Sequence, residues 1–250
     1  ANQEAIGRVP NGNEEDVQRA VLSCKKAFEN GWRDQSPESR ARILLNLAAQ
    51  MEAEGNDLAI LETLQTGKTY REVLGKDVAQ AIRVMRYYAG WVDKHSGDVF
   101  QLGGSSIGMV QNEAYPVVGA LLPSASPLLS TCYKIAAAIA AGSTLVLKPS
   151  ELTPLSVLRL GELVVECGAP AGVVNVVAGR GLTSGQALAR SPHLESILFS
   201  GSIENARHVL VSAAKSNLKT VHINAGGKSA NIIFEDADVK AACTAAWQAI

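Results

Sequence analysis

Apolar side chains recur every three or four residues through the first third of the chain, a spacing that predicts amphipathic helices. Residues 14–29 carry the clearest apolar stripe, formed by Val17, Val21, Cys24 and Phe28. A second helix is expected to begin with Ser36 as its N-cap and to be closed by Gly55. Two further helices are predicted over residues 57–65 and 70–95.

The pattern changes over residues 97–113, where glycines interrupt short runs of β-prone residues. The runs include Val99 and Phe100 on one side and Ile107 to Val110 on the other. We expect a two-stranded excursion here. An isolated hairpin is only marginally stable and has unpaired edges, so it is expected to dock on another surface.

After residue 115 the chain alternates between short apolar runs of strand length and helical segments. The predicted strands are residues 117–122, 145–147, 173–177, 196–199, 220–223 and 230–234. The helices predicted between them are residues 128–141, 154–167, 183–190 and 203–214. Parallel strands need crossover connections, so this alternation predicts an α/β fold with a doubly wound parallel sheet that is covered on both faces.

Composition narrows the class of protein. The chain has 250 residues, is 47% hydrophobic and carries a formal net charge of −1. It lacks the basic excess with which proteins bind nucleic acid or anionic lipid electrostatically. The longest apolar run, residues 135–147, is too short to span a bilayer, and the start of the chain has no secretory pattern. We therefore expect a cytoplasmic protein with no nucleic-acid or membrane partner.

Neither the cysteines nor the histidines suggest a metal site or a catalytic pair. Cys24, Cys132, Cys167 and Cys243 lie far apart in apolar helical runs and are expected to be buried free thiols. The four histidines show no ligand spacing and are interpreted as surface or packed residues. The chain ends inside a helix predicted to begin near Asp238, so we expect a module of a longer polypeptide or a cut fragment.

Ligands of doubly wound sheets bind at the carboxyl ends of the strands, so the segments that follow each strand are the candidate sites. Pro149 stops one strand and leaves Lys148 and Glu151 at its end, where they are suited to bind ribose hydroxyls. A solvated ion pair explains the two residues equally well. The segment 123–127 follows the first strand of the sheet, and an ordinary capped loop accounts for it.

Three glycine-containing segments are candidate anion sites. Residues 179–185 resemble a dinucleotide fingerprint but have one residue too many between the second and third glycines. Ser202 opens a helix whose free N–H groups suit a phosphate, although a plain capped helix is an equal alternative. Gly226 and Gly227 precede Lys228, but His222 stands where a P-loop needs glycine, which excludes that motif.

Taken in order, these segments closely resemble the NAD(P)-dependent aldehyde dehydrogenase superfamily. The resemblance is carried by the motifs YPVVG at 115–119, LKPSELTP at 147–154, GVVNVV at 172–177, FSGS at 199–202 and GGKSANIIFEDAD at 226–238. It implies a Rossmann-like cofactor domain with an N-terminal helical segment and a protruding oligomerisation hairpin. The implied parts are residues 1–96, 97–114 and 115–250, without a catalytic domain.

The resemblance also implies the cofactor contacts. Lys148 and Glu151 would bind the adenine ribose, Gly181 and Gly185 would lie near the adenosine, and Ser202 would face the pyrophosphate. The family commonly has glycine where this chain has Ala206, and the extra methyl group would weaken binding. We therefore expect NAD or NADP to bind weakly, or binding to be lost.

The catalytic pattern departs further from the family. Ala125 stands where the family has an asparagine whose amide stabilises the oxyanion, a loss that costs about a hundred- to a thousandfold in rate. Asn224 stands where the family has its general-base glutamate and cannot accept a proton at neutral pH. The family's nucleophilic cysteine would follow residue 250, and Cys243 lies too close to Asn224 to replace it. No catalytic residue is therefore assigned within the chain.

These departures make the chain resemble the truncated, non-catalytic C-terminal module of the bimodular aldehyde dehydrogenase family sixteen. Our leading hypothesis is a pseudoenzyme module that supports homo-oligomerisation or docks on a catalytic aldehyde dehydrogenase module. The alternative is the cofactor-binding half of an active enzyme that oxidises aldehydes to carboxylic acids. A third hypothesis is a regulatory module that still binds NAD.

Overall fold

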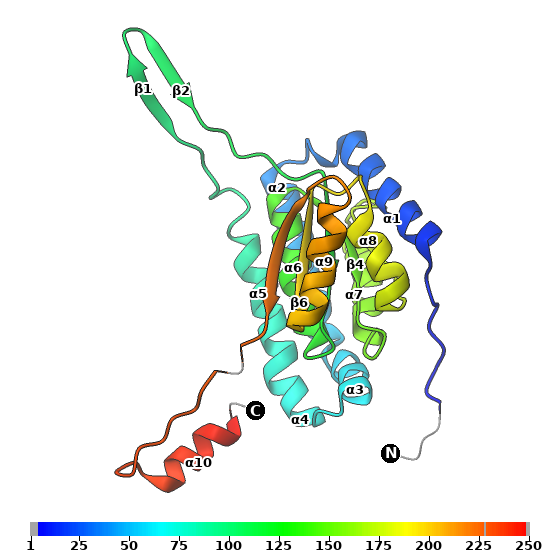
Figure 1. The fold of residues 1–250 in the computed structure, drawn as a ribbon, viewed down its shortest axis with the longest axis vertical. Helices are drawn as coiled ribbons and strands as arrows, with labels where there is room; N and C mark the ends of the chain where they lie inside the picture. Colours follow the sequence, from blue (N-terminus) through cyan, green and yellow to red (C-terminus); the bar gives the residue numbers. More distant parts are fainter. Residues whose placement is uncertain (1–4, 228, 249–250) are drawn as a thin grey trace.

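The computed structural model describes residues 5–227 and 229–248. Figure 1 shows a layered body made of helices and a sheet, a hairpin that projects far from it, and a separate C-terminal helix. None of the described helices is long and apolar enough to cross a membrane.

Helices form most of the first ninety residues. They are α1 (Glu14–Ala27), α2 (Pro37–Ala53), α3 (Gly55–Thr66), α4 (Tyr70–Glu72) and α5 (Ala79–Ala89). Two short π-helical segments, η1 (Phe28–Trp32) and η2 (Val73–Val78), lie between them. Ser36 caps α2 through the N–H of Ser39, as predicted. Gly67 ends α3 in the left-handed conformation, with φ +78°.

Several helix boundaries differ from the prediction, most clearly at Gly55 and at the end of the helix expected over residues 70–95. Gly55 begins α3 and does not close α2, because Glu54 ends one helix and directly starts the next. The helix expected over residues 70–95 is interrupted by η2 and ends at Ala89. Beyond that point Trp91 and Lys94 form turns of their own. Apolar spacing fixed the buried face of this segment but not the residue at which the helix stops.

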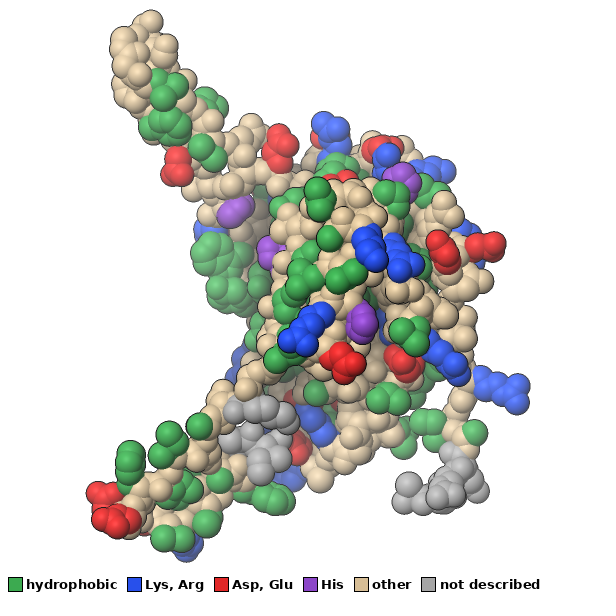
Figure 2. Space-filling model, viewed as in Figure 1, with side chains coloured by type: hydrophobic (Ala, Val, Ile, Leu, Met, Phe, Trp, Pro, Cys, Tyr) green, Lys and Arg blue, Asp and Glu red, His purple; other side chains and the backbone are tan. Residues whose placement is uncertain are grey.

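The hairpin consists of β1 (Val99–Gly103) and β2 (Ser106–Met109), paired antiparallel. It extends away from the rest of the chain, and Figure 2 shows hydrophobic side chains along it. The exposed apolar side chains are Val99, Phe100, Leu102, Ile107, Met109 and Val110. The hairpin therefore presents apolar surface that this chain does not bury.

A five-stranded parallel sheet forms the centre of the remaining part. Its strands are β3 (Val117–Leu121), β4 (Thr144–Lys148), β5 (Val174–Val176), β6 (Ser196–Gly201) and β7 (Thr220–Ala225). The strand order is β5-β4-β3-β6-β7, so the chain winds outward from β3 in one direction and then returns to lie beside it. The predicted doubly wound α/β sheet is confirmed.

Helices cover both faces of this sheet. The sheet separates the hydrophobic core into two clusters, one on each face. The connecting helices are α6 (Pro127–Ala141), α7 (Leu155–Glu166), η3 (Gly181–Gly185), α8 (Gln186–Arg190) and α9 (Ile203–Ala214). Along β3, Val118 and Ala120 face the cluster built with α2, α5, α6 and α7, whereas Val117 and Leu121 face the cluster built with α1, α8 and α9. Alternate side chains of one strand thus anchor the two layers.

The predicted strand at 230–234 is wrong. The chain leaves β7 through Gly226 and Gly227, which have φ values of +81° and +99°, and the following residues have no partner strand in the described parts of the chain. Phe234 is 75% exposed. The apolar run has β propensity, but a strand also needs a neighbour to which it can hydrogen bond.

Helix α10 (Val239–Gln248) follows this segment and lies apart from the sheet (Figure 1). Cys243 is on this helix and is exposed, whereas the other three cysteines are buried. The expectation of four buried thiols is therefore wrong for Cys243, because α10 does not pack against the core.

Candidate functional site

The carboxyl ends of β3, β4 and β6 surround a cleft of about 500 Å³. The cleft lies where the winding of the sheet reverses, between β3 and β6, and ligands of open parallel sheets bind at such a reversal. The five residues expected to bind a cofactor come from three separate segments, and all of them line this cleft: Lys148, Glu151, Gly181, Gly185 and Ser202.

Lys148 and Glu151 form the polar centre of one wall. Lys148 is the last residue of β4, and its side chain is only 7% exposed. Its Nζ donates a hydrogen bond to Glu151 Oε2 at 3.1 Å. Partial burial opposes ionisation of Glu151, but hydrogen bonds from backbone N–H groups and from Lys148 outweigh that effect and lower its pKa. The pair therefore presents a fixed ammonium and an ionised carboxylate to the cleft.

The glycine segment forms the π-helical turn η3 beside this pair. The N–H groups of Thr183 and Gly185 both donate to the carbonyl of Arg180, at 3.2 Å each. A Cβ on Gly181 would meet no neighbouring atom of the described residues within 4 Å, so this position borders open space in the cleft. Gly179 is different, because a Cβ there would lie 2.7 Å from the carbonyl oxygen of Gly12.

Ser202 caps helix α9 by accepting the N–H of Asn205 at 3.3 Å. The N–H groups of Ile203 and Glu204 belong to the first turn and have no acceptor within the helix, which makes this terminus favourable for an anion. Ala206 is 4% exposed and belongs to the core cluster on this side of the sheet. Its methyl group is thus part of the packing beneath α9.

Some polar groups in the cleft were not singled out from the sequence. Arg180, Asn205 and His208 also line it. The only signal for Arg180 was its position between two glycines. Asn205 and His208 share one face of α9 with the N-cap, which the helical spacing from Ser202 would have shown. His208 is exposed, in agreement with the surface interpretation of the histidines.

The two positions at which the catalytic pattern departs lie at the edges of the cleft. Ala125 follows Pro123 and Ser124, which line it, and precedes Ser126, whose φ is +46°. Asn224 lies on the edge strand β7 in register with Ser200 of β6, another cleft residue. Ala125 therefore has no side-chain donor for an oxyanion, and the amide of Asn224 cannot act as a base.

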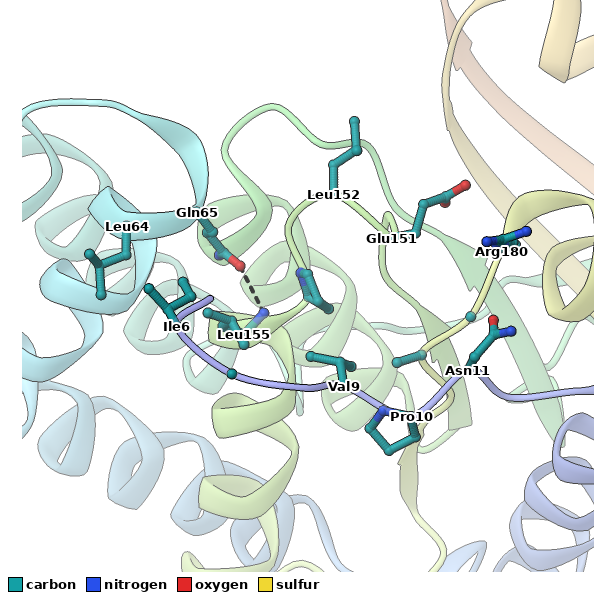
Figure 3. A pocket seen from close by; sticks show the side chains of 14 residues that line it. Ile6, Val9, Pro10, Asn11, Leu64, Gln65, Glu151, Leu152, Leu155 and Arg180 are labelled. Carbon is teal, nitrogen blue, oxygen red and sulfur yellow. Dashed lines mark hydrogen bonds between the residues drawn. The ribbon is translucent and has the colours of Figure 1, made fainter. Parts of the chain in front are cut away.

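A second cavity, of about 480 Å³, lies behind the wall that carries Glu151. Figure 3 shows the N-terminal segment with Ile6, Val9 and Pro10 running along it, with Leu152 and Glu151 across from this segment. Glu151 and Arg180 line both cavities. Nothing in the sequence predicted this cavity. In the described part of the chain, no group of three or more His, Cys, Asp or Glu side chains is placed to hold a metal ion.

Comparison with known proteins identifies the fold and its family. The model of the aldehyde dehydrogenase family matches residues 1–250. The chain belongs to the aldehyde dehydrogenase family.

Aldehyde dehydrogenases of known name share much of this sequence. The NADP/NAD-dependent aldehyde dehydrogenase PuuC of Escherichia coli K12 is 43% identical over 235 residues, which are 94% of this chain and 48% of PuuC. A putative aldehyde dehydrogenase of Bacillus subtilis, DhaS, is 43% identical over 236 residues, with the same coverage. The chain thus spans about half the length of the curated relatives it matches.

Solved aldehyde dehydrogenase structures superpose closely on this fold. PnpE in complex with nicotinamide adenine dinucleotide has a TM-score of 0.94 at 42% identity, covering 98% of this chain and 50% of PnpE. A mutant of the P. syringae indole-3-acetaldehyde dehydrogenase AldA, in complex with NAD⁺ and IAA, has a TM-score of 0.95 at 37% identity. That match covers 99% of this chain and 50% of AldA. The resemblance to the superfamily is confirmed.

Proposed function

We propose that this chain is the NAD(P)-binding portion of an aldehyde dehydrogenase. The observation that carries the proposal is the convergence of Lys148, Glu151, Gly181, Gly185 and Ser202 on one cleft at the reversal of the sheet. The NAD complexes of PnpE and AldA support it, because both structures superpose on nearly the whole chain. As in the sequence analysis, the proposed parts are residues 1–96, 97–114 and 115–250.

The groups in the cleft fit a dinucleotide. Lys148 and Glu151 offer a donor and an acceptor for the two hydroxyls of a ribose. The first turn of α9 offers free N–H groups to the pyrophosphate, and Gly181 leaves space beside them. When bound, NAD would supply the hydride acceptor for the oxidation of an aldehyde. The residues of this chain bind and orient it.

The chemistry supported by the family is oxidation of an aldehyde to a carboxylic acid. Its nucleophilic thiol is expected from sequence that follows residue 250. Ala125 and Asn224 lower the rate expected for this oxidation. The absence of the oxyanion donor at Ala125 alone reduces the rate about a hundred- to a thousandfold. We therefore propose a dehydrogenase with an altered site.

A second candidate is a non-catalytic module of the kind found in family sixteen. Ala125 and Asn224 favour it, because both departures lie inside the preserved fold and neither side chain can perform the family's chemistry. The exposed apolar hairpin supports a role in homo-oligomerisation or in docking on a catalytic module. Aldehyde-dependent formation of NADH by the complete protein separates the two candidates.

Calorimetric titration of NAD into the purified chain tests whether the cleft binds the cofactor. Ser202→Asp keeps an N-cap residue but adds a negative charge at the proposed pyrophosphate site. Ser36→Asp makes the same change at the cap of α2, away from the cleft, and serves as the control. We expect saturable binding that Ser202→Asp abolishes and Ser36→Asp preserves. No binding by the unmodified chain, or equal effects of the two variants, would contradict the proposal.

A further inference from the structure

The helices that follow the two main loops of the cleft begin without a local cap. Helix α6 follows the loop containing Pro123 and Ser124, and its N-cap residue, Ser126, makes no capping hydrogen bond with its side chain. Helix α7 follows the loop containing Ser150 and Glu151, and its N-cap is Pro154, which has no side-chain acceptor. Both helices therefore need other acceptors for their first N–H groups.

Two residues near the end of α3 provide these acceptors. Glu62 Oε1 accepts the N–H of Leu128 in α6 at 3.1 Å. Gln65 Oε1 accepts the N–H of Leu155 in α7 at 2.7 Å. One turn of α3 thus caps both helices from outside, and a carboxylate near their positive ends is favourable.

Glu62 and Gln65 are also bonded to each other. Gln65 Nε2 donates to Glu62 Oε2 at 2.9 Å, and Ser156 Oγ donates to the same oxygen at 2.6 Å. Glu62 is fully buried. Burial raises its pKa, although the bonds from Ser156, Leu128 and Gln65 oppose that increase. The stabilisation of this carboxylate in the interior therefore comes from donors that belong to the two capped helices and to Gln65.

Further contacts extend this connection into the loops. Lys68 Nζ donates to Ser126 Oγ at 2.6 Å and to Asp77 Oδ2 at 2.8 Å. Ser126 has the left-handed conformation, which a serine adopts only when its surroundings enforce it. Thr153 Oγ1 donates to the carbonyl of Ser124 at 3.3 Å and so links the two loops directly.

We propose that Glu62 and Gln65 are positioning residues that hold the two cleft loops in the arrangement a dinucleotide requires. This inference rests on the proposed function, because it concerns the same cleft. Neither residue lines the cleft itself. They hold the first turns of α6 and α7 in place through the N–H groups of Leu128 and Leu155. A displacement of either helix would therefore move Ser124 or Glu151 relative to the other cleft residues.

Exchanging the two side chains tests this inference. Glu62→Gln places two amide NH₂ groups against each other, and Gln65→Glu places two carboxylates together, so each single variant breaks the pair. The double variant Glu62→Gln/Gln65→Glu again has one carboxylate and one amide. In it the amide oxygen of residue 62 accepts from Leu128, and the new carboxylate accepts from Leu155, Ser156 and residue 62. We expect each single variant to bind NAD about tenfold more weakly and the double variant to return to within about threefold of the unmodified chain.

The control variant is Leu58→Ala, which removes a fully buried side chain on the same helix. It should lower the melting temperature and leave NAD affinity unchanged. The inference is overturned if the single variants lower only the melting temperature, or if the double variant fails to restore affinity. If the unmodified chain does not bind NAD, the proposed function fails. Hydrogen exchange at the amides of Leu128 and Leu155 then decides the positioning role alone, with faster exchange in the single variants and recovery in the double variant supporting it and unchanged exchange overturning it.

Discussion

The ammonium of Lys148 and the carboxylate of Glu151, 3.1 Å apart, place an ionised acid on the wall of the cleft where a ribose is proposed to lie. A phosphate on the 2′-hydroxyl would bring about two further negative charges to this wall. We therefore predict that NAD binds at least about tenfold more tightly than NADP. Calorimetry with both dinucleotides measures the preference, and Glu151→Gln should reduce it. Equal affinities in the unmodified chain would contradict this role of Glu151.

The hairpin provides a second prediction. Ile107 and Met109 alternate with Gly108, so their side chains share one face of β2, and both are exposed. We expect Ile107→Lys/Met109→Lys to shift an oligomer toward monomers, because charged side chains oppose burial of this face. The stability of the monomer should change by no more than about 0.5 kcal/mol. Sedimentation velocity and thermal unfolding measure the two effects, and an unaltered oligomer would exclude the hairpin from the interface.

The cysteines differ in predicted reactivity. Burial raises the pKa of Cys24 to about 11, although bonds involving Thr144, Asn175 and Leu145 oppose it. About one in a thousand Cys24 thiols would then be ionised at pH 8, and Cys132 and Cys167 also have raised pKa values. Exposed Cys243 should react rapidly with a thiol reagent in the folded protein, and the other three only after unfolding. Rapid labelling of Cys24 would contradict its burial.

Acid should weaken the contact between α7 and the junction of α2 with α3. Arg159 binds Glu54 through two hydrogen bonds, of 2.9 and 2.6 Å, and these lower the pKa of Glu54 below its usual 4.5. A lowered pKa in the folded state means stability that is present above pH 4.5 and is lost as the pH falls through the folded pKa. Glu54→Gln should cost about 1 kcal/mol at pH 7 and less at pH 3. Urea unfolding at both pH values measures this, and an equal cost at both would contradict it.

Much of the fold could be predicted because it depends on local patterns. The buried strands β3 and β4 are apolar runs, Ser36 and Ser202 mark helix starts through their side-chain oxygens, and Gly67 marks a helix end through its left-handed backbone. The strand at 230–234 was predicted wrongly because pairing depends on a neighbour that an apolar run does not reveal. The prediction that Cys243 is buried was wrong for a related reason. The apolar spacing of α10 does not show whether the helix packs against the core.

The candidate site was predictable only where its residues follow strands. Lys148, Glu151 and Ser202 were singled out because the carboxyl ends of parallel strands share one edge of the sheet, and the structure places all three at the cleft. The connection of Glu62 and Gln65 to α6 and α7 could not be found this way, because it joins residues separated by 66 and 90 positions. Local rules show that a helix needs a cap but not which distant side chain provides it.

We propose that a dinucleotide occupies the cleft between β3 and β6. Hydrogen exchange of the chain with and without saturating NAD shows where the ligand lies, because bound segments exchange more slowly. We expect protection in residues 148–151, 180–186 and 199–209, the three segments that contribute most of the residues lining the cleft. Unchanged exchange, or protection confined to the N-terminal segment and Leu64 at the second cavity, would exclude the dinucleotide from this cleft.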